Sequence, residues 1–281
     1  MPIRLNAEDI ERYHKDGFIV PPFRISDSWL KRMRDAAADL LESAPQHADF
    51  APSPHVPNYT PGVINRHWLE LAGIPEVLDV LEQLIGPNFL MWGSSYFGKP
   101  ALIGKETPWH QDGEYWQIKP MASVTVWFAI DASTKENGCL RVIPGSHKTK
   151  SLLKHRRDDR DALTLNQTID DDTFDEAGAI DIELEPGQFS IHDVYIAHAS
   201  RPNRSPHRRA SVSYRFMPTT SHFDHAAAGE MARTMGVTDM SRRPLYLMRG
   251  VDCDGRNDLS VGHADVEAAY ANARVVSEYK T

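Results

Sequence analysis

The chain has 281 residues, 41% of them hydrophobic and 25% charged, which is an ordinary composition for a globular protein. A net charge of −8 argues against nucleic acid or an anionic membrane as the main partner, because both bind basic surfaces. No apolar run is long enough to span a bilayer, and the charged N-terminus does not resemble a signal peptide. Cys139 and Cys253 form no Cys-x-x-Cys pair, so we expect no zinc ribbon or disulfide scaffold, and a reducing, cytoplasmic location.

The first part of the chain predicts helices around a short strand. We expect helices over 6–16, 27–43 and 75–86, a strand over 17–23, and a loop over the proline-rich segment 44–65. Asn6 can cap the first helix and Gly17 can end it. One stripe of the second helix is apolar and predicts a buried face: Trp29, Met33, Ala36, Ala37, Leu40 and Leu41.

From about residue 88 to 218 the pattern changes to short strands between turns. Strands are expected in "FLMWGSSYFGK", "SVTVWFAID", "CLRVIPGS", "AIDIELEPGQFSIHD" and "RASVSYRFMP", a spacing that predicts a β sandwich, barrel or jelly roll. The acidic segment 154–178 is expected to be a surface loop or lid, and the tail 225–281 to be polar and partly helical. The simplest division is one domain over 1–281, with helices in 6–86, the β core in about 88–218 and an extension in 219–281.

Candidate metal ligands occur in "TPWHQDGEYW", residues 107 to 116. On an extended strand His110 and Asp112 point to the same face. A later histidine would complete a set of two histidines and one carboxylate, which holds iron(II) and leaves three coordination positions open. Both His192 and His198 are candidates. We favour His198, because Arg209 follows eleven residues later and can return beside the metal to bind the far carboxylate of a dicarboxylic co-substrate.

The chain resembles the phytanoyl-CoA dioxygenase family of iron(II)- and 2-oxoglutarate-dependent oxygenases. The resemblance covers most of residues 8 to 216, through "DIERYHKDGFIV", "PWHQDGEYW", "VWFAIDASTKENGCLRVIPGSHK" and "HASRPNRSPHRRASVSY". It implies a mainly β fold with flanking helices, built on a double-stranded β-helix, the cupin-like jelly roll. It also implies that His110, Asp112 and His198 bind iron(II), in a reaction that consumes 2-oxoglutarate and O2 and releases succinate and CO2.

The resemblance further implies a 2-oxoglutarate site. Arg209 would bind the distal carboxylate, although Arg208 stays open because the preceding loop looks about one residue short. Trp127 would line the co-substrate pocket, and Ser95 occupies another position that often touches 2-oxoglutarate. Because Asp112 is present, where halogenating relatives have a small residue, we expect hydroxylation rather than halogenation.

Three residues after the metal-binding sequence bear on the substrate. Glu114, Tyr115 and Trp116 follow into a turn, where an acid with aromatic rings can hold a cationic head group. The alternative is that Tyr115 and Trp116 only pack the jelly roll. We therefore expect a small polar or zwitterionic substrate, such as an amino acid derivative, a betaine-like amine or an aminophosphonate. An acyl-CoA or a natural product is the alternative substrate.

Two other classes of protein compete with an oxygenase. A zinc or manganese hydrolase could use the same three ligands, but it would need neither Arg209 nor Trp127. A non-catalytic, cupin-like binding protein usually lacks one of the metal ligands, and all three are present here. We rank both below the oxygenase, and no pattern in the sequence predicts the oligomeric state.

Overall fold

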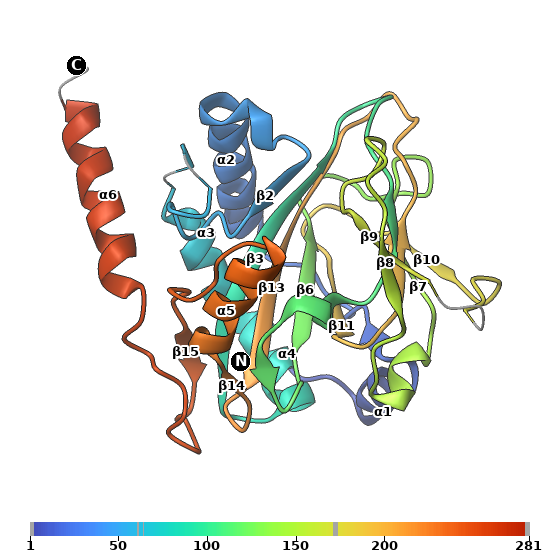
Figure 1. Cartoon of the computed structure of the whole chain (residues 1–281). Coiled ribbons are helices and arrows are strands. Elements are labelled where there is room, and N and C mark those ends of the chain that lie inside the picture. The colour runs from blue at the N-terminus through green and yellow to red at the C-terminus, as the bar shows by residue number, and fades with distance from the viewer. Residues whose placement is uncertain (1–2, 61, 64, 171–173, 279–281) are drawn as a thin grey trace.

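The computed structural model describes residues 3–60, 62–63, 65–170 and 174–278. Two antiparallel sheets face each other, and helices cover the outer face of the larger one (Figure 1). The larger sheet has the order β1–β11–β6–β13–β3–β15, with β2 also paired to β3, and the smaller sheet the order β10–β7–β12–β4. This is the jelly-roll type of core that the strand pattern predicted.

The strands of the larger sheet are β1 (Phe18–Ile19), β2 (Phe50–Pro52), β3 (Phe89–Lys99), β6 (Val124–Ala129), β11 (Phe189–Asp193), β13 (Arg209–Pro218) and β15 (Tyr246–Arg249). Those of the smaller sheet are β4 (Thr107–His110), β7 (Leu140–Val142), β10 (Ile180–Ile182) and β12 (His198–Ser200). Two short pairs lie outside both sheets, β5 (Ile118–Lys119) with β14 (His222–Phe223) and β8 (His155–Arg157) with β9 (Gln167–Ile169).

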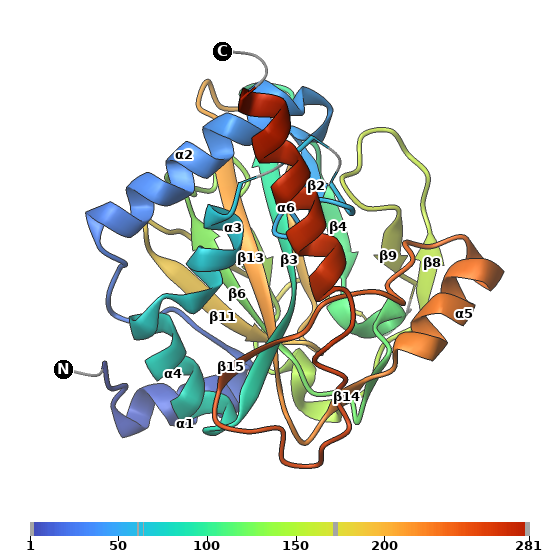
Figure 2. The ribbon, with the colours of Figure 1, turned by 90° about the vertical axis from the view of Figure 1, so that its left-hand side faces the viewer.

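The helices are α1 (Ala7–Asp16), α2 (Asp27–Ser43), α3 (His67–Glu70), α4 (Pro75–Ile85), α5 (His225–Met235) and α6 (His263–Glu278). Figure 2 shows α2, α3 and α4 lying across the near face of the larger sheet. Their apolar side chains form one core with that face, which includes Met33 of α2 and Leu81 of α4. No helix among the described residues is long and apolar enough to cross a membrane.

Alternation along β13 separates this core from the interior between the two sheets. Val212, Tyr214 and Phe216 belong to the core under the helices. Because successive side chains of a strand point to opposite faces, Arg209 and Arg215 point the other way and line a cavity between the sheets. One strand thus supplies both core packing and two cationic side chains.

The three predicted N-terminal helices are confirmed. The side chain of Asn6 accepts a hydrogen bond from the backbone N–H of Asp9 at 2.7 Å, and Gly17 ends α1 with a φ of 83°. The other two helices, α2 and α4, begin and end within one residue of the predicted bounds.

The loop and strand predictions needed correction in four places. The strand expected over 17–23 is only two residues long, since the prolines that follow lack a backbone donor. The loop 44–65 contains a 3-10 turn (Pro45–His47) and β2. The tail contains β15, which extends the larger sheet beyond β3 and was not predicted.

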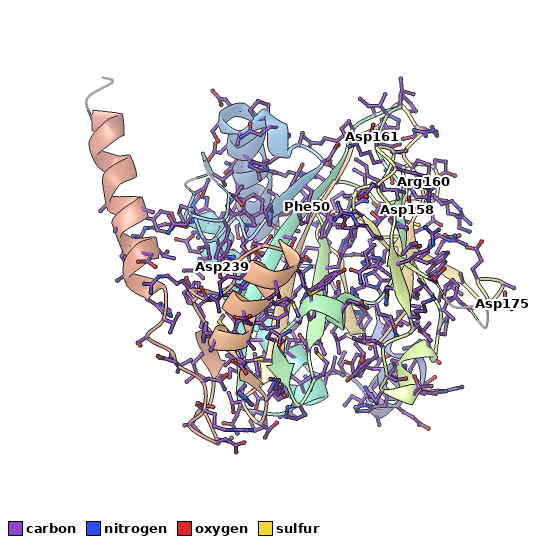
Figure 3. The ribbon with its side chains drawn as sticks, in the orientation of Figure 1. Phe50, Asp158, Arg160, Asp161, Asp175 and Asp239 are labelled. Carbon is purple, nitrogen blue, oxygen red and sulfur yellow. The ribbon has the colours of Figure 1, made fainter. Side chains whose placement is uncertain are left out.

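The fourth correction concerns segment 154–178, which was expected to be a surface loop or lid. It forms a hairpin of β8 and β9, in which His155 pairs with Ile169. The hairpin's outer loop is held by Arg160, whose guanidinium lies 2.9 Å from the carboxylate of Asp158 (Figure 3). Leu165 reaches the cavity between the sheets, so the hairpin forms part of the wall. Residues 171–173 of the segment lie outside the described residues.

A buried histidine under the larger sheet makes stability depend on pH. His55 is fully buried, and its Nδ1 lies 2.6 Å from the hydroxyl of Ser94. Burial and the charges of Arg243 and Arg215 lower the pKa of His55 to about 3. A histidine of the unfolded chain has a pKa of about 6.5. At a pH between these two pKa values, the unfolded chain therefore binds a proton at His55 that the native protein does not bind.

We accordingly expect His55 to stabilise the fold above pH 6.5 and to lose that contribution as the pH falls toward 3. Between pH 7 and pH 5 the loss is about 2 kcal/mol in the free energy of unfolding. Urea unfolding of the metal-free wild type and of His55→Gln at both pH values measures it. The variant should lose less stability on acidification, and an equal loss in both proteins would contradict the assignment.

Candidate metal centre

Strand pairing brings the two predicted histidine ligands together. His110 ends β4 and His198 begins β12, and the two residues are direct partners in the smaller sheet. Their ring centroids are 4.1 Å apart. Asp112 was expected on the same strand, but it begins a 3-10 turn, Asp112–Tyr115. Gln111 between them remains extended, at φ −117° and ψ 141°.

The ring nitrogens of both histidines have separate roles. Nδ1 of His110 donates to the carbonyl of Pro108 at 2.8 Å, and Nδ1 of His198 donates to the carbonyl of Ile196 at 3.1 Å. Each Nε2 then faces Oδ1 of Asp112, at 3.9 Å for His110 and 4.0 Å for His198. Backbone carbonyls therefore fix the tautomer that leaves both Nε2 lone pairs for a metal.

The carboxylate of Asp112 is oriented in a similar way. Oδ2 accepts a hydrogen bond from the hydroxyl of Thr125 at 3.1 Å, while Oδ1 faces the two histidines. Burial would raise the pKa of Asp112, but His192, Arg215 and the other histidines outweigh burial and hold the pKa well below its usual range. The carboxylate is therefore ionised and available as a ligand.

The histidines are held in the neutral form that metals bind. Burial is the main cause that lowers the pKa of His110, and burial together with the neighbouring imidazole of His110 lowers the pKa of His198 further. One ligand atom from each of these histidines and from Asp112 lies within 4.8 Å of the others. Two imidazole nitrogens and one carboxylate oxygen in this arrangement fit iron(II) and leave coordination positions for other ligands.

The alternative ligand, His192, also reaches the site. It is buried on β11, its ring centroid is 4.9 Å from that of His198, and its Nε2 is 3.9 Å from Oδ2 of Asp112. Neither ring nitrogen has a hydrogen-bond partner among the described residues. His192 faces the oxygen that Thr125 already holds, whereas His198 shares Oδ1 with His110.

The ligand cluster opens into a cavity of about 190 Å³ between the two sheets. Arg209 lines this cavity and is buried, with its guanidinium 5.3 Å from the ring centre of Trp127. One of its nitrogens donates to the hydroxyl of Ser211 at 2.7 Å. Arg208 does not line the cavity, because its side chain turns outward and binds Asp131 at 2.8 Å.

Of the other predicted site residues, two line the cavity and two do not. Tyr115 and Trp116 line the cavity, and Trp116 also packs against Trp92 with ring centroids 4.4 Å apart. Glu114 is not part of the lining, and its carboxylate lies 2.8 Å from Nδ1 of His155. Ser95 is not part of the lining either, and its hydroxyl accepts a hydrogen bond from Arg215 at 2.9 Å.

Sequence analysis did not name several residues that line the site, including three polar ones that bear on the candidate metal centre. Thr125 and Arg215 line the cavity, and Gln111 links the turn that begins at Asp112 to the segments after β7 and after β11. The amide of Gln111 donates to the carbonyl of Tyr195 and accepts from the backbone N–H of Leu153, both at 2.6 Å. Arg215 could have been found, because it lies six residues after Arg209 on a predicted strand and so on the same face.

Comparisons with known proteins agree with this geometry. The sequence profile of the phytanoyl-CoA dioxygenase (PhyH) family matches residues 13–211. The phytanoyl-CoA dioxygenase domain-containing protein 1 homolog of Dictyostelium discoideum is 28% identical over 157 residues, which span 55% of this chain and only 56% of that protein. The ectoine dioxygenase of Sphingopyxis alaskensis is 25% identical over 264 residues, 87% of this chain and 83% of that protein.

A solved structure shows the same fold. The non-heme monooxygenase ThoJ, in its apo form, superimposes with a TM-score of 0.68 and 26% identity, over 86% of this chain and 84% of that one. The family match covers well over half of the chain, and His110, Asp112 and His198 are close enough together to hold a metal ion. The chain belongs to the phytanoyl-CoA dioxygenase family and is an iron(II)- and 2-oxoglutarate-dependent oxygenase.

Proposed function

We propose that this enzyme hydroxylates a small polar or zwitterionic molecule, such as an amino acid derivative, a betaine-like amine or an aminophosphonate. The observation that supports this class is the size and lining of the cavity. Its volume of about 190 Å³ is below the roughly 300–1,000 Å³ of drug-sized ligand sites. Two arginines and three histidines line it, together with aromatic and aliphatic side chains such as those of Phe97, Trp116 and Leu165. A relative named for ectoine, a small zwitterionic molecule, matches most of both chains.

In this proposal His110, Asp112 and His198 hold iron(II), and Arg209 binds the distal carboxylate of 2-oxoglutarate. Iron(II), 2-oxoglutarate and O2 together would supply the oxidant that removes a hydrogen from the substrate, with release of succinate and CO2. The guanidinium of Arg209 can make two parallel hydrogen bonds to a carboxylate, and the ring of Trp127 covers it from one side. This wall would fix the co-substrate and keep water from its charged end.

The rest of the chain's contribution is positioning. The carbonyls of Pro108 and Ile196 set the two histidine tautomers, and Thr125 sets the rotation of the Asp112 carboxylate. Tyr115 and Trp116 would form the substrate wall. Glu114 is not part of the cavity lining and would influence the site only through its contact with His155.

A screen for succinate release tests the substrate class. The enzyme, with iron(II), 2-oxoglutarate and O2, is offered betaines, amino acid derivatives and aminophosphonates in one set, and acyl-CoA thioesters in another. We expect a member of the first set to raise succinate release above the rate without substrate. The acyl-CoA set represents the family's namesake reaction, and stimulation by that set alone would overturn the proposal. Asp112→Ala is the control for release that does not depend on the metal site.

A further inference from the structure

A second arginine of β13 lines the cavity and forms no direct ion pair with a carboxylate among the described residues. Arg215 is partly buried, and one of its terminal nitrogens donates to the hydroxyl of Ser95 at 2.9 Å. Its guanidinium lies 5.3 Å from the ring centre of Trp116, and its Nε is buried without a hydrogen-bond partner. Among the described residues it makes no ion pair, so the head group keeps donors for a ligand.

Arg215 lies at a different end of the cavity from Arg209. Arg209 pairs with Lys99 at the start of β13, whereas Arg215 pairs across the sheet with Thr125. Thr125 is the residue whose hydroxyl holds Asp112. Arg215 is therefore placed beside the metal carboxylate, six residues along the strand from the arginine proposed to bind 2-oxoglutarate.

The charges around the cavity do not balance. Asp112 is the only acidic residue among the described residues that line it. Iron(II) and 2-oxoglutarate carry equal and opposite charges, so a loaded site with Asp112 and both arginines keeps one net positive charge. A partly buried charge without a counter-charge is costly, and a ligand with one negative group would remove that cost.

A third arginine increases the positive charge on the same side. Arg243 is buried next to Trp92, where its guanidinium binds the hydroxyl of Ser53 at 2.8 Å. Burial is the main cause that lowers the pKa of Arg243 to about 10, and the charge of Arg215 acts in the same direction. Among the described residues, no carboxylate forms an ion pair with Arg243 either.

We propose that Arg215 is the subsite for an anionic group of the substrate, a carboxylate or a phosphonate, whose charge completes the balance of the loaded site. This inference rests on the proposed function and makes it more specific: the substrate is an acid, and its negative end lies on the Asp112 side of the cavity. The ring of Trp116 supports the guanidinium, so Trp116 acts as a platform for Arg215.

Direct binding of small anions tests the subsite without knowledge of the substrate. The enzyme is loaded anaerobically with iron(II) and saturating 2-oxoglutarate, and its Tm is followed with acetate, methylphosphonate or neutral acetamide. A ligand that binds only the native state raises Tm. We expect acetate or methylphosphonate, and not acetamide, to raise the Tm of the wild type. The larger rise of the two distinguishes a carboxylate from a phosphonate subsite.

Arg215→Gln should need about 10- to 100-fold more anion for the same rise in Tm, because charge-assisted hydrogen bonds are lost. Arg208→Gln is the matched control, since Arg208 lies on the outer side and should behave as the wild type. If Arg215→Gln does not fold, Arg215→Lys replaces it, and weaker anion binding supports the subsite. Unchanged anion binding in the Arg215 variant that folds, or equal effects of acetate and acetamide on the wild type, overturns it.

The two proposals fail separately. If anions bind through Arg215 but no small zwitterion is turned over, the anion subsite stands and the proposed substrate size is wrong. If a small amine without an acidic group is turned over at the same rate by the wild type and Arg215→Gln, the proposed function stands and the anion subsite is wrong.

Discussion

Replacing Asp112 by alanine is expected to abolish turnover and to weaken iron(II) binding by more than about 100-fold. Changes to residues that only orient a metal ligand already lower metal affinity by about 10- to 100-fold. Asp112 would supply a ligand oxygen, and it carries the only negative charge among the described residues of the cavity wall. The measurement is anaerobic titration of the metal-free protein with iron(II) and 2-oxoglutarate, which should give the weak visible charge-transfer band of the chelate in the wild type alone.

Thr125→Val provides a graded comparison for this result. It removes the hydrogen bond that holds Oδ2 of Asp112 but leaves all three ligands in place. We expect iron(II) binding to weaken by about 10- to 100-fold, with the chelate band still present at high metal concentration. A chelate band of normal strength in Asp112→Ala would mean that the metal is held elsewhere, and the neighbouring His192 would then be the first residue to replace.

The helices and the core strands could be predicted from sequence because their signals are local. The cap at Asn6, the turn at Gly17 and the apolar stripe of α2 each act within a few residues. The prediction was wrong where distant partners decide the structure. The strand β2 exists because its backbone pairs with β3, and no pattern in a proline-rich segment reports such a partner.

At the candidate site too, local spacing predicts some features, and distant partners decide the others. His110 and Asp112 could be paired from their spacing alone. The preference for His198 over His192 rested on the position of Arg209 and was then supported by the family resemblance, since both histidines lie on strands that reach the cavity. The structure adds what sequence could not name, the carbonyls of Pro108 and Ile196 that orient the ligands. These are backbone groups, which every residue has, so the sequence does not reveal which of them orient the ligands.

The choice between the two adjacent arginines gives the second large expected effect. Arg209→Ala should raise the Kd for 2-oxoglutarate on the order of 100-fold or more, because removing one partner of a buried charged pair costs about 2 to 5 kcal/mol. Arg209 is buried in the cavity wall beside Trp127. Titration of the iron(II) protein with 2-oxoglutarate, followed by the chelate band, measures this Kd directly.

Arg208→Ala is the matched control, one residue earlier on the chain and on the opposite face. Its guanidinium binds Asp131, and that carboxylate would keep the backbone N–H of Ala210 as a partner after the change. We expect an unchanged Kd for 2-oxoglutarate and a loss of stability of at most about 1 kcal/mol, as for other exposed ion pairs.

Arg209→Lys separates charge from geometry at the same position. Lysine keeps the positive charge but cannot make two parallel hydrogen bonds from a planar group. A Kd between those of the wild type and Arg209→Ala would show that both contribute. If instead the Kd rises in Arg208→Ala and not in Arg209→Ala, the side chain of Arg208 and not that of Arg209 faces the cavity, and the two faces of β13 are exchanged. Arg215 would then point away from the cavity together with Arg209, so this one comparison also tests the face of the strand on which the anion subsite depends.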